Sequence, residues 1–152
     1  MNTAIIRGRT LTFKKRPDSA NDTESYNFIE DGALLVTNGI ISKLDSFSNI
    51  IAEAPKDITI YDHRPHLLVP GFIDTHSHHD RNLLENPDAL ALLSQGVTTI
   101  IVGQDGGSNL PVVELKEALW ITPTSVNLGS YVGHGTIRRE IMGVDYMRPA
   151  NP

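Results

Sequence analysis

Residues 67–80 read LLVPGFIDTHSHHD, an apolar run followed by a cluster of histidines and aspartates. The first eight of these residues are almost all apolar, which is typical of a strand buried on both faces of a sheet. Beyond such a strand, every second side chain of an extended backbone points to the same face. The residues that share this face are Asp74, His76, His78 and Asp80, whereas His79 points the other way. The stretch therefore predicts a buried strand with histidines and carboxylates at its end.

Two imidazoles at one strand end are suited to bind a single metal ion. Neutral imidazole is a common ligand of zinc, iron and nickel, and a neighbouring carboxylate orients such a ligand. The carboxyl ends of parallel strands are also where α/β folds place their active sites. The alternative is a solvated, histidine-rich turn, and the buried strand with its aspartates favours the metal site at His76 and His78. His63 and His66 lie in a polar stretch before the strand and are predicted to be surface residues.

The pattern after residue 67 is that of alternating strands and helices. Further strands are predicted at 97–102 and 125–132, with helices at 83–95 and 112–120 between them. The strands start at intervals of about 30 residues, which is typical of βαβ units and a parallel sheet. A complete (β/α)₈ barrel needs about 250 residues, so residues 67–152 hold about three of its βα units.

The first 66 residues predict a separate β-rich domain. Asn38-Gly39 lies between two short β-rich runs and is a strong signal for a hairpin turn. Residues 14–22 are polar and predict a loop, and only residues 49–54 suggest a helical turn. We therefore expect two domains, at residues 1–66 and 67–152.

Composition excludes several classes of protein. The 152 residues carry a net charge of −5, which gives no basic surface for nucleic acid. The absence of cysteine excludes disulfides and thiolate ligands. No apolar run reaches the roughly 20 residues of a membrane-spanning helix, so the sequence predicts a cytoplasmic protein with no membrane partner.

Two other polar groups follow the third predicted strand. His134 lies between two glycines that permit close approach to a ligand, which makes it a candidate substrate-binding residue. The alternative is a tight turn whose histidine faces solvent. Arg138 and Arg139 are candidates for binding a substrate carboxylate, although one of two adjacent helical arginines is usually solvated.

Residues 71–78, Gly-Phe-Ile-Asp-Thr-His-Ser-His, resemble the metal-binding signature of the amidohydrolase superfamily. The resemblance implies a metal-centred (β/α)₈ barrel and a small β-sandwich, to which residues 1–66 would contribute. It also implies that His76 and His78 bind a divalent metal, with zinc as the expected ion.

The two halves of the chain resemble different branches of that superfamily. Residues 1–75 are similar to the start of bacterial guanine deaminases. Residues 76–148 resemble N-acyl-D-amino-acid deacylases (D-aminoacylases), through the motifs at 76–80, 94–99, 102–108 and 133–138. Where those deacylases use a cysteine ligand, this sequence has Asp105, which is either a third metal ligand or a simple loop carboxylate.

These resemblances imply a hydrolase of carbon–nitrogen bonds in a small molecule, an N-acyl amino acid. The first alternative is deamination of guanine or another purine. The second is a non-catalytic truncated fragment, or one part of a two-chain assembly. The general base of the superfamily comes from later strands, so no catalytic base is assigned, and we expect the chain alone to be inactive. We also expect it to self-associate or to need a missing C-terminal part.

Overall fold

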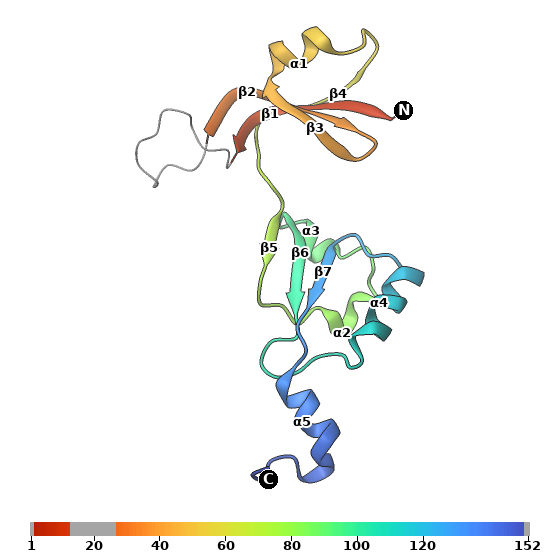
Figure 1. The fold of residues 1–152 in the computed structure, drawn as a ribbon. Helices are drawn as coiled ribbons and strands as arrows, with labels where there is room; N and C mark the ends of the chain where they lie inside the picture. Colours follow the sequence, from red (N-terminus) through yellow and green to blue (C-terminus); the bar gives the residue numbers. More distant parts are fainter. Residues whose placement is uncertain (1, 13–26, 151–152) are drawn as a thin grey trace. The chain divides into compact units, whose positions relative to one another are not determined.

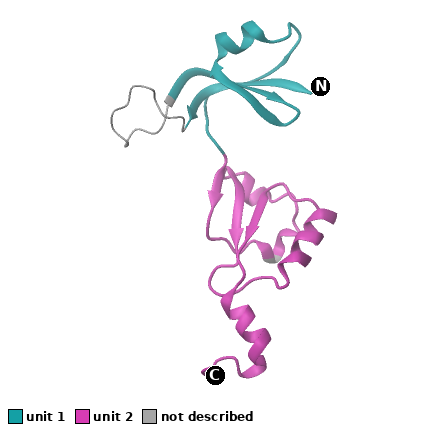
Figure 2. Cartoon of the chain, viewed as in Figure 1, with its two compact units in different colours: residues 1–70 teal, residues 71–152 magenta. Residues whose placement is uncertain are grey.

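The chain forms two compact units in a computed structural model that describes residues 2–12 and 27–150. Residues 1–70 make up the first unit and residues 71–152 the second (Figure 2). The loop predicted at residues 14–22 lies outside the described residues. No helix among the described residues has both the length and the apolar character needed to cross a membrane.

The first unit is built on a mixed four-stranded sheet (Figure 1). Its strand order is β3-β2-β1-β4, with bounds β1 Thr3–Thr12, β2 Asn27–Thr37, β3 Ile40–Ser46 and β4 Thr59–Leu68. Asn38 and Gly39 form the turn between β2 and β3 with φ of 50° and 81°, values that a type I′ turn requires. The predicted hairpin is confirmed.

One helix, α1 (Phe47–Glu53), packs on this sheet. The hydroxyl of Ser46 accepts a hydrogen bond from the Asn49 backbone N–H and so begins the helix. Ile50 of α1 is buried with Ile5 and Ala33 of the sheet. The core of the first unit therefore lies between α1 and the sheet.

The second unit contains a parallel three-stranded sheet of order β5-β6-β7. The strands are β5 Phe72–Asp74, β6 Val97–Val102 and β7 Asn127–Ser130. The helices are α2 Asp80–Leu83, α3 Leu90–Leu93, α4 Val112–Ile121 and α5 His134–Met142, followed by the 3₁₀ turn η1 Gly143–Asp145. The parallel order predicted from the spacing of the strands is confirmed.

A single core joins the helices to the central strand of this sheet. Ile100 and Val102 of β6 are fully buried, and Leu83 and Leu92 pack with them from α2 and α3. Leu119 of α4 packs against the same cluster. Because these helices share one core, they cover the same side of β6, as the βαβ pattern requires.

The continuous strand predicted at residues 67–74 is wrong. Leu67 and Leu68 belong to β4, where they pair with Arg9 and Thr10 of β1. The second unit begins only at Gly71, four residues later than the predicted domain boundary. Phe72 and Ile73 are 55% and 62% exposed, so β5 is not buried on both faces. The apolar pattern alone does not show that the first residues of this run belong to one sheet and the last to another.

The single helix predicted at residues 83–95 is also wrong, because within that range only Leu83, the last residue of α2, and the short helix α3 are α-helical. Pro87 lies between them, and a proline lacks the N–H that a helix interior needs and disfavours helical geometry in the residue before it. Gly96 does end this segment with φ of 79°, in the position predicted for a C-terminal glycine.

Candidate metal centre

His76 and His78 follow β5, and Asp105 follows β6. Since β5 and β6 are parallel neighbours, their carboxyl ends meet at one edge of the sheet. The Nε2 atoms of both histidines lie 3.1 Å from the same oxygen, Oδ2 of Asp105. The ligand atoms of all three residues lie within 4.8 Å of one another. The structure thus brings together the two predicted histidines and the predicted carboxylate.

The loop after β6 has an unusual backbone that presents Asp105. Asp105 has φ of 56°, in the left-handed region that aspartate tolerates better than most residues. Gly103 and Gly106 beside it have φ of 87° and 81°. A side chain at Gly103 would collide with the carbonyl of Tyr131, so only glycine fits there. The glycine pattern of residues 103–107 therefore positions the carboxylate.

Hydrogen bonds hold the two ligand-bearing loops against each other. The side chain of Gln104 donates from Nε2 to the Thr75 carbonyl over 2.6 Å. The backbone N–H of Ser77 donates to the carbonyl of Ile101 over 3.0 Å, which extends the pairing between β5 and β6. Asp74 accepts from the backbone N–H of His76 over 3.1 Å. The histidines therefore start from a fixed backbone, although their rings are exposed.

Charge and spacing at the cluster suit a divalent cation. Hydrogen bonds from His76 and His78 lower the pKa of Asp105, which keeps the carboxylate ionised at neutral pH. Bonds from zinc to nitrogen and oxygen are about 2.0–2.2 Å, so neighbouring ligand atoms of a tetrahedral ion lie about 3.3 Å apart. The observed 3.1 Å between each imidazole and Asp105 is close to that value. The three residues fit a single ion as its ligands.

Polar pockets flank the cluster. One, with a volume of about 340 Å³, is lined by Asp74, His76, Ser77, His78, His79 and Asn82. Another, of about 270 Å³, is lined by residues of the loops after β5 and β6 and of helices α2 and α5, namely His78, Asp80, Gln104, Asp105, Gly107, Ser108, Asn109, Thr136 and Arg139. A small molecule bound in either pocket would lie beside His78.

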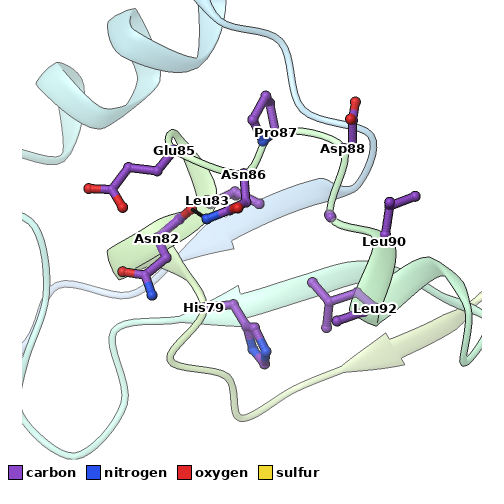
Figure 3. Close-up of a pocket in the computed structure, with 11 residues that line it drawn as sticks. His79, Asn82, Leu83, Glu85, Asn86, Pro87, Asp88, Leu90 and Leu92 are labelled. Atoms are coloured by element: carbon purple, nitrogen blue, oxygen red, sulfur yellow. Dashed lines mark hydrogen bonds between the residues drawn. The ribbon is translucent and has the colours of Figure 1, made fainter.

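His79 also contributes to a larger pocket of about 460 Å³, formed mostly by α2, α3 and the residues between them (Figure 3). Its Nδ1 lies 3.0 Å from the hydroxyl of Ser77, a side chain that is 2% exposed. His79 is absent from the group of three potential ligands. His79 therefore shares one pocket with His76 and His78 but does not join their contact with Asp105.

His134 is the first residue of α5, and its ring is not brought to the cluster. It is exposed and lines neither polar pocket. Its backbone neighbours do contact the loop that carries Asp105, because the Gly133 N–H donates to Ser108 Oγ over 2.8 Å. The substrate-binding role of His134 stays a prediction.

The other histidines and arginines considered in the sequence lie in different parts of the structure. His63 and His66 are exposed in β4 of the first unit. Arg138 donates to the backbone carbonyls of Tyr146 and Arg148, whereas Arg139 lines the pocket beside Asp105. Asn109 also lines this pocket and lies outside every motif quoted from the sequence. Its position directly after the glycine-rich loop was the available signal.

No protein-family model matches the chain. Among curated proteins, it is 34% identical over 134 residues to N-acyl-D-aspartate deacylase from Alcaligenes xylosoxydans xylosoxydans, covering 73% of this chain and 26% of that enzyme. It is 33% identical over 78 residues to guanine deaminase from Escherichia coli strain K12, covering 51% of this chain and 18% of that enzyme. The chain thus spans about a quarter or less of the length of these relatives.

Solved structures of D-aminoacylases are also similar to this chain. A D-aminoacylase structure concerned with the role of its binuclear metal centre matches at 27% identity and a TM-score of 0.60, over 74% of this chain and 27% of its own. A second D-aminoacylase structure, described as defining a subset of amidohydrolases, matches in fold at 24% identity and a TM-score of 0.68, over 92% and 31%. The predicted resemblance is confirmed: the chain is homologous to part of the N-acyl-D-amino-acid deacylases and guanine deaminases and shares the α/β fold of amidohydrolases.

Proposed function

We propose that this chain supplies the first metal ligands of a metal-dependent hydrolase of carbon–nitrogen bonds, most like an N-acyl-D-amino-acid deacylase. The observation that carries the proposal is the convergence of His76, His78 and Asp105 at the carboxyl ends of two parallel strands. Two imidazoles and one carboxylate are a donor set typical of catalytic zinc sites. The likeness to N-acyl-D-aspartate deacylase and to a D-aminoacylase with a binuclear metal centre supports the same reaction class.

The fold proposal follows from the same comparisons. We propose that residues 71–152 correspond to about three βα units of a (β/α)₈ barrel. Residues 1–70 would be one share of a small β-sandwich. The parallel order β5-β6-β7 and the helices on one side of β6 support the first assignment. The mixed sheet of the first unit supports the second.

Each residue of the cluster has a defined task in this function. A divalent ion, with zinc as the proposed ion, would supply Lewis-acid activation of a carbonyl group and of water when bound. His76 and His78 would offer the lone pairs of Nε2, which requires both rings to be neutral. Asp105 would add the negative charge and offer Oδ2 as a third donor to the same ion, in place of the Nε2 contacts it makes in this structure. Small-molecule substrates fit because the flanking pockets are about 270 and 340 Å³.

The function is tested first through the metal. Zinc titration of the purified chain by calorimetry should give one tightly bound ion per chain. The double variant His76→Ala/His78→Ala should lose that binding, while His63→Ala/His66→Ala should keep it, because those histidines lie in the first unit. Equal zinc binding by all three proteins would contradict the proposed centre.

Guanine deamination is the second candidate function. It is favoured by the 33% identity to guanine deaminase over 78 residues. The discriminating experiment supplies zinc and compares the binding of an N-acetyl-D-amino acid with that of guanine. Selective binding of guanine would favour the deaminase, and selective binding of the N-acetyl-D-amino acid would favour the deacylase.

A further inference from the structure

The pocket between the loop after β6 and helix α5 contains one cation, Arg139, beside the proposed metal ligands. Its volume is about 270 Å³, and His78 and Asp105 line it together with Arg139. Since Arg139 and the proposed metal ligands line the same pocket, a small molecule that fills it would lie against both. What the pocket binds therefore depends on which of its polar groups are free.

Most of the other polar side chains in this pocket are engaged with each other. Asn109 donates from Nδ2 to Oδ2 of Asp80 over 3.1 Å. Ser108 Oγ accepts from the Gly133 N–H over 2.8 Å, and Thr136 Oγ1 accepts from the Ser108 N–H over 3.0 Å. These contacts build the wall of the pocket and join α5 to the loop.

The guanidinium of Arg139 uses a smaller share of its hydrogen-bonding groups than these side chains do. Among the described residues, the one side-chain hydrogen bond of Arg139 is a long contact of 3.4 Å from Nη2 to the hydroxyl of Tyr146, whose ring centroid lies 4.7 Å from the guanidinium carbon. Within residues 2–12 and 27–150, it has no ion-pair partner at 4.0 Å or less. A guanidinium has five N–H donors, so most of them are available to a ligand. Tyr146 therefore restrains the guanidinium but leaves most of its N–H donors available.

The neighbouring Arg138 shows the contrast. Its Nε donates to the Tyr146 carbonyl over 2.7 Å, and its Nη2 donates to the Arg148 carbonyl. Arg138 thereby fixes the backbone after α5, and it does not line the pocket. Of the two adjacent arginines, only Arg139 is placed to bind a ligand beside Asp105.

We propose that Arg139 is a specificity-determining residue that binds a carboxylate of the substrate in this pocket. The inference rests on the proposed function, because the scissile group must lie at His76, His78 and Asp105. Arginine pairs with carboxylates through two parallel hydrogen bonds, which gives both affinity and orientation. Guanine carries no carboxylate, so Arg139 favours an N-acyl amino acid over a purine.

The test uses the zinc-loaded chain and two probes, N-acetyl-D-aspartate and the uncharged N-acetyl-D-alanine amide. Calorimetry measures the dissociation constant of each probe for the wild type, Arg139→Gln, Arg139→Lys and the control Lys116→Gln. Lys116 is an exposed residue of α4 outside the pocket, so its change removes the same charge elsewhere. Zinc affinity is measured first for every variant.

Arg139→Gln should weaken binding of N-acetyl-D-aspartate about tenfold or more, because a charge-assisted pair is lost. Arg139→Lys should recover part of that loss, and Lys116→Gln should bind like the wild type. The amide probe should bind equally to all four proteins. If zinc binds but Arg139→Gln binds N-acetyl-D-aspartate as well as the wild type, or the wild type does not bind it, the assignment to Arg139 is overturned. Failure of the wild type to bind zinc would instead overturn the proposed function.

Discussion

Asp105 distinguishes this cluster from the deacylase pattern that the sequence resembles, in which a cysteine occupies the corresponding place. A carboxylate oxygen is a harder donor than a thiolate, so it reduces the preference for soft ions. The same oxygen receives contacts from both His76 and His78. A change at this one residue should therefore alter both how tightly a metal binds and which metal is preferred.

Asp105→Asn should lower zinc affinity about 100-fold or more, since even changes at residues that only orient a ligand cost 10–100-fold. Asp105→Cys should retain zinc and shift selectivity from manganese toward cadmium. Competition against a chelator measures both effects. Asp80→Asn is a control from the same pocket. An equal effect of Asp80→Asn and Asp105→Asn would argue against ligation by Asp105.

Asp62 of β4 gives a prediction for pH. Hydrogen bonds from the side chain and backbone N–H of Arg64 lower the pKa of Asp62 to about 2. Since an unfolded aspartate has a pKa of about 3.9, this pair stabilises the first unit above that pH. The stabilisation is lost as the pH falls through about 2. Urea denaturation should show Asp62→Asn to be modestly less stable than the wild type at neutral pH, with the difference shrinking as the pH falls toward 2 and disappearing below it.

At the level of single residues, the sequence predicted that His76, His78 and Asp105 lie close together, and their role as metal ligands stays a prediction. Alternation along an extended strand predicted that His79 would differ from His76 and His78, and His79 is indeed outside their group, although the backbone after β5 bends and His79 has helical φ and ψ. The sequence could not distinguish Arg138 from Arg139. Which of two adjacent helical residues faces a pocket depends on how α5 packs, and that depends on contacts with residues 106–108.

At the level of helices and strands, the sequence predicted the order of the elements but missed two of their boundaries. The spacing of the strands predicted the parallel order of the second unit, because a crossover between parallel strands needs a dozen or more residues, usually a helix. The boundary between β4 and β5 was missed, since both strands are apolar and only their pairing partners differ. The break between α2 and α3 was missed although Pro87 marks it.

The central strand β6 should dominate the stability of the second unit. Ile100→Ala should cost about 2–5 kcal/mol of unfolding free energy, because Ile100 is fully buried and the change leaves a cavity. The same substitution at Ile121, which is 81% exposed, should change it by less than about 0.5 kcal/mol. Thermal or urea unfolding compares them. Similar losses at both positions would contradict the core described for β6.

Considered as a whole molecule, the chain leaves much apolar surface uncovered. In the second unit, the exposed apolar side chains include Phe72, Ile73, Trp120, Ile121, Tyr131, Ile141, Val144 and Met147. Strands β5 and β7 each pair only with β6 among the described residues. Open strand edges and large apolar patches are sites of association.

We therefore expect the purified chain to self-associate, with a larger associated fraction at higher protein concentration. Sedimentation velocity should show larger species as the concentration rises. Ile73→Lys should reduce them, because a charge on an edge strand opposes pairing. Ile141→Lys, on α5, separates association through the helix from association through the strand edge. A monomer at all concentrations for the wild type would contradict this expectation.

The contacts of His76 and His78 with Asp105 also have a topological consequence. They join positions 29 and 27 residues apart in the chain, and the enclosed segment contains α2, α3 and all of β6. An ion held by these side chains would act as a cross-link, and closing a loop of this length by a disulfide stabilises a protein by about 3–4 kcal/mol in the chain-entropy treatment. Conversely, the ligands meet only after the entire enclosed segment has folded. Metal affinity would thus report how completely the βαβ unit is folded. Mutations in its core would lower the affinity for the ion although the mutated side chains do not contact it.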